Sequence, residues 1–516
     1  MASRTRPLNL WAAVTAAALG CLTLGTAVVV ARQSGSLIPL PADWAAVRFT
    51  LLQAALSALI SCVLAIPVAR ALARRCFAGR SLLITLMGAP FLLPTIVAVL
   101  GLLAIFGRAG AVNDLVAWVG LPRLSIYGLH GVVLAHVFLN LPLAVRMILL
   151  GWQGIPAERF RLAASLGLTP AAMTRHLELP MLRAVLPGAA LVIFVLCLTS
   201  FAVALTLGGG PRATTVELAI YQALRFDYDP ARAASLALMQ FTLCALAAAA
   251  GWAVAREGGF GAGLDRPAPI TAPGGWRRIA DAAAITLAAG FLLIPLAAIV
   301  YRGVPGVVDL PTGLPQAMAR SVAVALASTL LTGVAALTLA LAVAARTKGA
   351  TLFEAAAMLP LAASGLVLGT GLFLLVRPFA RPEDLALPVT VLVNATLALP
   401  FVYRLLLPQA RALHADYDRL AQSLCLSGWH RLAWVTLPRL SRPLGFGLGV
   451  AAALSMGDLG VITLFAGERG VTLPLLVHRL MGSYRMDAAA SAALILVCAS
   501  FALFALFDWM GRRAAP

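Results

Sequence analysis

Few ionisable side chains of this protein lie deep inside apolar stretches of the sequence, and Asp458 is the clearest of them. It stands in the sequence SMGDLG, deep inside an apolar stretch. A carboxylate inside a membrane-crossing helix costs roughly a few kcal/mol unless it faces water or a partner. Two roles therefore stay open for Asp458: lining a polar path or gate across a membrane, or making structural hydrogen bonds.

A second group of acidic and aromatic residues gathers in one segment. Glu217 and Tyr221 lie near the start of an expected helix, and Asp227, Tyr228 and Asp229 follow it. Carboxylates and aromatic faces attract cations, so these residues would suit a transport path or gate, with Asp227, Tyr228 and Asp229 as its acidic-aromatic lip. Two other roles stay open, the docking of a soluble protein and the capping of the next helix by Asp229.

Other kinds of chemistry find little support. The six histidines and seven cysteines show no metal-ligand spacing and no CxxC pair. A phosphate-binding Walker loop needs Gly-Lys-Ser/Thr, whereas the single lysine, Lys348, follows Thr347. We therefore expect no catalytic residue, no metal, no cofactor bound by this chain, and no ATP hydrolysis of its own.

A polar motif occurs twice. RLAASLG at 161–167 returns as RLAQSLC at 419–425, and the proline that follows each copy is also repeated 258 positions later, which is half of the 516 residues. The loops 158–180 and 416–438 each predict a short amphipathic helix, a turn and a second helix. One such loop in each half indicates a docking surface for a two-fold symmetric soluble partner. The candidate docking residues are Arg161, Leu162, Ala163, Leu166, Gly167, Pro180, Arg419, Leu420, Ala421, Leu424, Cys425 and Pro438.

The elements that must position these residues are membrane helices. Apolar residues form 61% of the chain and charged residues 11%, far from the usual balance of roughly half and a quarter. Apolar runs of about twenty residues predict an all-α integral membrane protein with about twelve spans. The net charge of +19 is scattered over short connections, which argues against a nucleic-acid partner. With a cytoplasmic N-terminus, most Lys and Arg residues fall on the cytoplasmic side, and an even span number returns the C-terminus there.

The spans divide into two halves. Residues 1–255 and 278–516 would each hold six spans, as two parallel six-helix repeats joined by a cytoplasmic linker at 256–277 rich in Gly, Pro and Arg. Gly101 and Gly371 also match, at an offset of 270. Proline at positions 90, 94 and 360 should break or kink the helices that contain it. An even number of spans in each half places the pseudo-two-fold axis along the membrane normal.

The duplicated motif resembles the signature of membrane subunits of bacterial ATP-binding-cassette importers: EAA, three residues, Gly, nine residues, Ile-x-Leu-Pro. Gly167 and Pro180 fit this spacing, as does Pro438. Arg161 and Arg419 depart from it at the acidic position and Cys425 departs at the second glycine, where we expect a more tightly packed or less mobile turn. The resemblance implies a type I importer fold in the bacterial inner membrane. It also implies an ATPase subunit, carrying ATP and Mg²⁺, on each of the two loops.

A narrower resemblance is to thiamine importer permeases. It covers the segment 200–240, the sequences FLNLP and DYDPARAA, the GSYR at 482–485, and the overall length. This resemblance implies a periplasmic thiamine-binding protein as partner, with thiamine, thiamine monophosphate or thiamine pyrophosphate as substrate. A ferric-iron importer permease is the alternative within this class. A membrane-embedded transferase acting on lipid carriers is the alternative outside it, and it would be expected to place acidic or histidine groups at an interface.

Overall fold

The computed structural model describes residues 6–34, 40–88, 92–210, 213–254, 275–307, 310–345, 349–467 and 470–515. Within these ranges the chain is built from helices and contains no strand. Most of the predicted linker at 256–277, together with Pro90, Thr347 and Lys348, lies outside the described residues. The prediction of an all-α membrane protein is confirmed.

The first half contains thirteen α-helices and two π-helical segments, which are labelled η, within the described residues. In chain order they are α1 (Arg6–Gly20), η1 (Cys21–Gly25), α2 (Thr26–Gln33), α3 (Pro41–Arg74), α4 (Arg80–Leu86), α5 (Thr95–Phe106), α6 (Ala111–Trp118), α7 (Leu129–Gln153), α8 (Ala157–Ser165), α9 (Pro170–Met173), η3 (Thr174–Glu178), α10 (Leu179–Leu198), α11 (Phe201–Leu207), α12 (Val216–Arg225) and α13 (Pro230–Val254).

The second half repeats this order with a few differences. Its elements are α14 (Trp276–Gly303), η5 (Pro305–Val307), α15 (Leu314–Ala344), α16 (Ala350–Met358), η6 (Leu359–Ala362), α17 (Gly365–Val376), η7 (Pro382–Leu385), α18 (Ala386–Ser423), α19 (Gly428–Arg431), η8 (Leu432–Thr436), α20 (Leu437–Met456), α21 (Gly460–Phe465), α22 (Leu473–Gly482) and α23 (Met486–Arg513). Here η8 is π-helical, and η5, η6 and η7 are 3₁₀ turns.

The predicted count of about twelve spans is confirmed. Eleven helices in the described ranges are long and apolar enough to cross a membrane, and a bent pair brings the count to twelve. This pair, Ala350–Ala362 and Gly365–Val376, bends by 93°, and the predicted break at Pro360 falls in it. The first half is also interrupted here, because α5 begins only after Pro94.

The two halves are joined by an exchange of their first helices. α1 packs on α15 and α16 and α2 packs on α17, all in the second half, whereas α14 packs on α3 and α5 in the first half. A Cβ atom on Gly101 would lie 2.8 Å from the Pro295 carbonyl oxygen of α14, and one on Gly371 would lie 2.5 Å from the Thr26 Cβ of α2. The two matched glycines therefore have the same structural role: each allows a first-span helix of the other half to approach closely.

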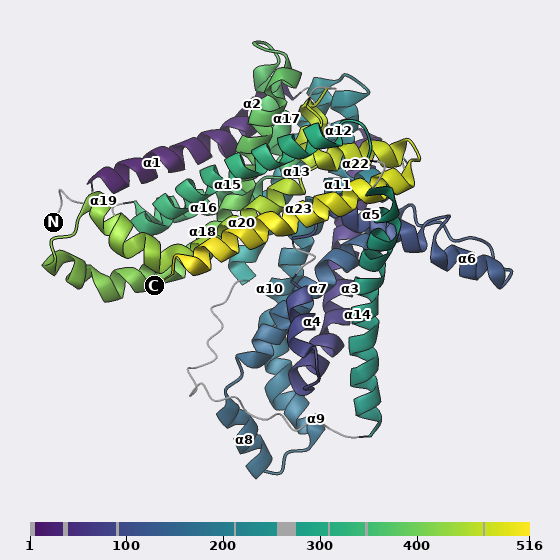
Figure 1. The fold of residues 1–516 in the computed structure, drawn as a ribbon, viewed down its shortest axis with the longest axis horizontal. Helices are drawn as coiled ribbons and strands as arrows, with labels where there is room; N and C mark the ends of the chain where they lie inside the picture. The colour runs from purple at the N-terminus through teal and green to yellow at the C-terminus, as the bar shows by residue number, and fades with distance from the viewer. Residues whose placement is uncertain are drawn as a thin grey trace.

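Figure 1 shows the resulting shape, in which two groups of helices diverge from a common region. One arm holds α3, α7, α10 and α14 and runs toward α8 and α9. The other arm holds α1, α15, α16, α18 and α20 and runs toward α19. The duplicated polar loops therefore lie at the ends of two different arms.

Candidate functional site

The first duplicated loop has the predicted helix, turn and second helix. α7 ends at Gln153, and Pro156 precedes a separate helix, α8. The turn after α8 is made by Gly167, whose φ of 62° lies in the left-handed region that favours glycine. Leu162 and Leu166 are 60% and 66% exposed. The first loop thus exposes two large apolar side chains, one on α8 and one directly after it.

A buried carboxylate fixes this first loop to the membrane body. Glu178 ends η3 and forms ion pairs with both Arg70, at 2.9 Å, and Arg74 of α3. Arg70 also donates a hydrogen bond of 2.7 Å to the Thr174 hydroxyl. Two guanidinium groups on one buried carboxylate satisfy the charge that burial would otherwise penalise. Our sequence reasoning missed this anchor, although Glu178 stands inside the repeated motif, two residues before Pro180.

The second loop is built differently. α18 runs without interruption from Ala386 to Ser423, so its last turns take the place of the separate helix α8. Leu420 and Leu424 are 52% and 61% exposed. Cys425 adopts φ of 54°, nearly the same left-handed turn as Gly167. The expected tighter packing at Cys425 is wrong, because this side chain is exposed.

Local pairs hold the second loop together. Asp418 forms an ion pair of 2.7 Å with Arg431 of α19 and accepts a hydrogen bond of 2.7 Å from Gln422. The Arg439 guanidinium lies 4.6 Å from the centre of the Tyr417 ring. These contacts join the end of α18 to the start of α20. None of them ties the second loop to a further span in the way that Glu178 ties the first loop to α3.

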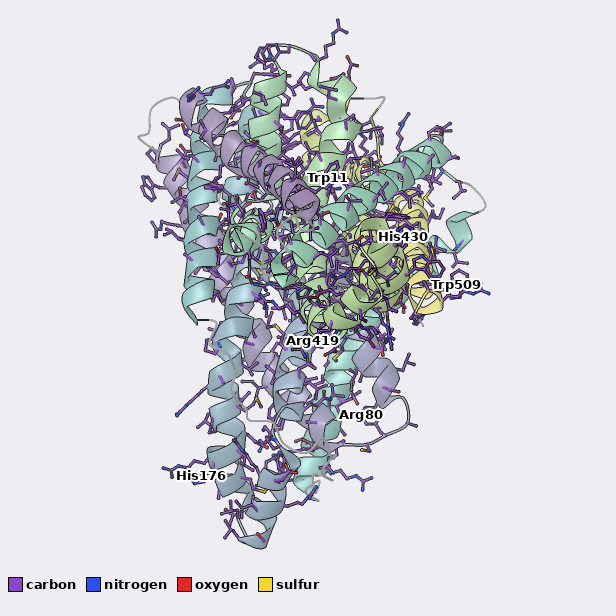
Figure 2. The ribbon with its side chains drawn as sticks, turned by 90° about the vertical axis from the view of Figure 1, so that its left-hand side faces the viewer. Trp11, Arg80, His176, Arg419, His430 and Trp509 are labelled. Carbon is purple, nitrogen blue, oxygen red and sulfur yellow. The ribbon has the colours of Figure 1, made fainter. Side chains whose placement is uncertain are left out.

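The other predicted loop residues divide between the surface and the interior. Arg161 and Arg419 are exposed and form no ion pair with another residue in the described ranges. Ala163 and Ala421 are buried and face the body of the protein. Pro180 and Pro438 lie in the first turns of α10 and α20. Figure 2 places His176 at the end of one arm and Arg419 and His430 on the other.

Asp458 lies where the fifth span of the second half is interrupted, between α20 and α21. Its Oδ1 accepts a hydrogen bond of 3.2 Å from the Gly460 amide, whereas its Oδ2 is buried and has no partner among the described residues. A Cβ on Gly457 would lie 3.1 Å from Pro94 of the first half. Asp458 therefore sits near the boundary between the halves, with one oxygen in a structural bond and one left over for a further ligand or water.

Each half also has a buried polar cluster contributed by three of its spans. In the second half, Ser455 accepts hydrogen bonds from Ser328 at 2.8 Å and from Asn394 at 3.0 Å. The equivalent residues of the first half are Ser57, His136 and Cys197, and the Ser57 hydroxyl lies 3.4 Å from the His136 ring. His136 matches Asn394, and Cys197 matches Ser455, both at an offset of 258. These clusters carry no motif, so our sequence reasoning did not find them.

The predicted path residues Glu217 and Tyr221 lie on α12, which precedes the predicted acidic-aromatic lip. Thr215 caps this helix by accepting a hydrogen bond of 3.3 Å from the Leu218 amide. Glu217 is buried, which raises the pKa of its carboxyl to about 8, and a hydrogen bond with Ser364 partly offsets the rise. Tyr221 lines a cavity of about 230 Å³ at the boundary between the halves.

The structure separates Asp227 and Tyr228 from this cavity. Asp227 pairs with Arg232 at 3.3 Å, and Tyr228 is 80% exposed in a left-handed turn with φ of 53°. Asp229 accepts a hydrogen bond of 3.0 Å from the Arg232 amide at the start of α13. For Asp229, the capping interpretation therefore holds. Among the residues that the structure describes, no acidic residue lines the cavity next to Tyr221.

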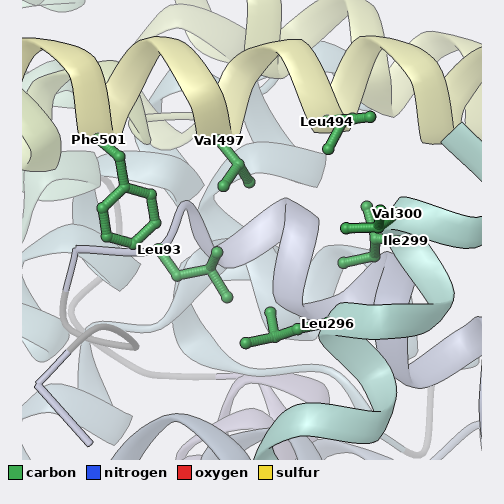
Figure 3. A pocket seen from close by; sticks show the side chains of 7 residues that line it. All are labelled: Leu93, Leu296, Ile299, Val300, Leu494, Val497 and Phe501. Atoms are coloured by element: carbon green, nitrogen blue, oxygen red, sulfur yellow. The ribbon is translucent and has the colours of Figure 1, made fainter. Parts of the chain in front are cut away.

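A second cavity, of about 110 Å³, is apolar. Figure 3 shows its lining by α14, α23 and the break before α5. The residues are Leu93, Leu296, Ile299, Val300, Leu494, Val497 and Phe501. Such a lining offers nothing to a charged solute.

No profile of a known protein family matches the chain. Curated relatives do match it over most of its length. The chain is 42% identical to the thiamine transport system permease protein ThiP of Salmonella typhimurium over 493 residues, 92% of this chain and 90% of the relative. It is 40% identical to the protein of that name from Brucella abortus (90% and 87% covered). It is 33% identical to the one from Haemophilus influenzae (87% and 86% covered).

Proposed function

The chain belongs to the family of thiamine transport system permease proteins, and we propose that it moves thiamine and its phosphate esters inward across the bacterial inner membrane. It is the permease subunit of a thiamine importer of the ATP-binding-cassette class. The ferric-iron permease and the lipid-carrier transferase are not favoured, since these relatives are named for thiamine transport.

The observation that carries the proposal is the pair of exposed leucine-bearing loops at the ends of the two arms. Leu162 and Leu166 mark one surface, and Leu420 and Leu424 mark the other. Two copies of one ATPase subunit would dock there, each receiving one loop. ATP and Mg²⁺ would bind to the ATPase. This chain would supply the two loops that the movement of the ATPase displaces.

The divergent arms indicate how movement of the two loops would be transmitted through the molecule. Closure of an ATPase pair around ATP would draw the two loops together, and a rigid-body movement would open the opposite side of the molecule. α12 and α22 lie on that opposite side, away from both loops (Figure 1). A periplasmic thiamine-binding protein would deliver substrate there, and ATP hydrolysis would then return the arms to the divergent arrangement.

The ends of the chain fit this orientation. Figure 1 shows the start of α1 and the end of α23 at the same end of the molecule as α19. Figure 2 likewise places Trp11 of α1 and Trp509 of α23 on the same face as His430. If the ATPase lies on the cytoplasmic side, both termini lie there as well.

Reconstitution tests the function. The permease, its ATPase and its binding protein would be placed in lipid vesicles, and uptake of labelled thiamine would be measured with ATP and with a non-hydrolysable analogue. We expect accumulation that requires both ATP and the binding protein. Accumulation of ferric iron without thiamine would reject the substrate assignment.

A further inference from the structure

The cavity of about 230 Å³ beside Tyr221 lies between the two halves and is strongly basic. α12 contributes Tyr221 and Arg225, and α22 contributes Leu475, His478, Arg479 and Gly482; Thr463 of α21 and Ala466 complete the lining. No carboxylate occurs in this set. The cavity is thus a different environment from the acidic lip that the sequence predicts for a cationic substrate.

Each of the two arginines is held by a backbone carbonyl, and the two carbonyls are consecutive in the chain. Arg225 donates a hydrogen bond of 3.2 Å to the Ala466 carbonyl, and Arg479 donates one of 3.3 Å to the Gly467 carbonyl. A guanidinium group has five N–H donors, so each arginine keeps several donors free after this bond. The consecutive carbonyls therefore fix two positive groups, one from each half, on one short stretch of chain.

These positive charges are not neutralised within the described part of the chain. Neither Arg225 nor Arg479 forms an ion pair there, and the nearby Glu383 carboxylate packs against the Gly467 backbone without reaching either guanidinium. Both guanidinium groups act on the same phenol, since each lowers the pKa of Tyr221 against the upward effect of its burial. Two like charges that line one cavity repel each other, and a bound anion reduces that repulsion.

An aromatic group adjoins the basic one. The Tyr221 ring makes edge contacts with Phe201, at 5.4 Å between ring centres, and with Phe226, at 5.7 Å. Phe201 is buried at the start of α11, whereas Phe226 is exposed at the end of α12. A ligand that carries both a phosphate and a flat cationic ring would find partners for both parts here.

We propose that this cavity binds the phosphate end of a phosphorylated substrate, with Arg225 and Arg479 as the specificity-determining residues for thiamine phosphate esters over thiamine. Arginine suits this role because its planar group makes paired, charge-assisted hydrogen bonds to phosphate oxygens. The ring end of the substrate would face Tyr221 and its aromatic neighbours. This inference rests on the proposed transport of thiamine compounds and adds to it the residues that discriminate among them.

The test compares substrates in the reconstituted importer. In the double variant Arg225→Gln/Arg479→Gln, each glutamine keeps a donor for the backbone carbonyl and loses the charge. We expect the KM for thiamine pyrophosphate uptake to rise about tenfold or more, and that for thiamine to change less than about twofold. The matched control is Arg485→Gln, an exposed arginine outside the cavity, which should change neither. The pair Arg225→Lys/Arg479→Lys should restore part of the preference, because it restores the charge.

A binding measurement on the purified permease separates this proposal from the transport function. Inorganic pyrophosphate should raise the melting temperature of the wild-type protein and of Arg485→Gln, but not that of Arg225→Gln/Arg479→Gln. The detergent should contain no phospholipid. A second series with added phosphatidylglycerol then shows whether a lipid phosphate competes for the same residues, and a preference for the lipid over pyrophosphate would overturn the substrate assignment.

The outcomes are distinct. Thiamine uptake without any effect of pyrophosphate on the wild-type protein would overturn the phosphate site and leave the proposed function standing. Stabilisation by pyrophosphate that requires both arginines, in a protein that transports no thiamine compound, would reject the proposed function and keep an anion site. Equal losses of thiamine and ester uptake in the double variant would also overturn the proposal, since the arginines would then be general parts of the path.

Discussion

The two duplicated polar loops, 158–180 and 416–438, share a backbone conformation and differ in how they are attached. Both contain a left-handed turn, at Gly167 and Cys425, and both continue into a π-helical segment, η3 or η8. The first loop is separated from α7 by a break and is tied to α3 through Glu178. The second loop is the uninterrupted end of α18, and the residue that matches Glu178 is Thr436.

If a partner displaced both loops, the two attachments would transmit the movement by two routes. A displaced first loop would pull on α3 through an ionic contact, because the break at Gly154 to Pro156 separates α8 from α7. A displaced second loop would act on α18 directly, since a continuous helix transmits force along its own hydrogen bonds. Symmetry is kept on the surfaces that a symmetric partner would touch and is lost in the connections behind them.

The largest expected effect comes from removing both docking surfaces. Leu166→Asp with Leu424→Asp places a charge in each apolar contact, and we expect loss of ATPase assembly by at least about a hundredfold. Co-purification of the ATPase with the permease would measure it. Leu121→Asp, an equally exposed leucine outside the loops, should have no effect. Retained assembly in the double variant would contradict the docking assignment.

The two single variants test whether the two docking surfaces are equivalent. If both loops receive identical ATPase copies, Leu166→Asp and Leu424→Asp should weaken assembly to similar extents, despite their different attachments. A strong effect of one variant alone would show that the surfaces have diverged as well.

The next largest effect is expected at Glu178. Glu178→Ala leaves two guanidinium groups without their buried partner, which should destabilise the first loop by roughly 2–4 kcal/mol, reduced by the partial exposure of Arg70. Thr436→Ala, at the matching position, should cost less than about 1 kcal/mol. Hydrogen exchange of the peptides covering 158–180 and 416–438 would measure both. Similar protection losses in the two variants would show that the anchor is not specific to the first loop.

A smaller, reciprocal effect is expected at the two turns. Cys425 is a non-glycine residue in the left-handed region, so Cys425→Gly should relieve backbone strain and stabilise the protein by about 0.5–1 kcal/mol. Gly167→Ala introduces the same strain and should destabilise it by about 1 kcal/mol. Thermal unfolding of the two variants in one detergent would show shifts of opposite sign. Shifts of the same sign would mean that side-chain contacts outweigh backbone strain at one of the turns.

The spans and the loops can be predicted from the sequence because each produces a local sequence pattern. Apolar runs of span length and a motif repeated at 258 need no knowledge of the fold. The anchor at Glu178 and the basic cavity escaped prediction because their partners are distant in sequence, with 104 positions between Arg74 and Glu178. The exchange of α2 and α14 escaped for the same reason, although the matched pair Gly101 and Gly371 marked its contact points.

At Asp227 and Tyr228 the opposite occurs: the sequence predicts a site that the structure does not form. Adjacent acidic and aromatic residues look like one site in sequence, yet Asp227 is occupied by Arg232 and Asp229 caps α13. Attraction of a cation needs carboxylates that are free of arginine partners. The composition of a segment does not reveal that pairing. In the fold, Arg232 of α13 also pairs with Asp43 of α3, which holds this arginine in place beside Asp227.

The smallest expected effect at neutral pH concerns Glu217, which matches Pro474 in the second half and is thus another point where the halves differ. Its raised pKa of about 8 keeps the buried carboxyl protonated at pH 7, so the neutral Glu217→Gln should change transport less than about twofold. The folded protein holds a proton that the unfolded chain has already lost above its lower pKa, so wild-type stability should fall as pH rises toward 8. Melting temperatures of the wild type and Glu217→Gln between pH 5 and pH 8 test this. The wild-type curve should fall more steeply, because glutamine has no proton to lose. Parallel curves would mean that the Glu217 carboxyl is ionised in the folded protein, and the residue would again be a candidate partner for a cation on the path.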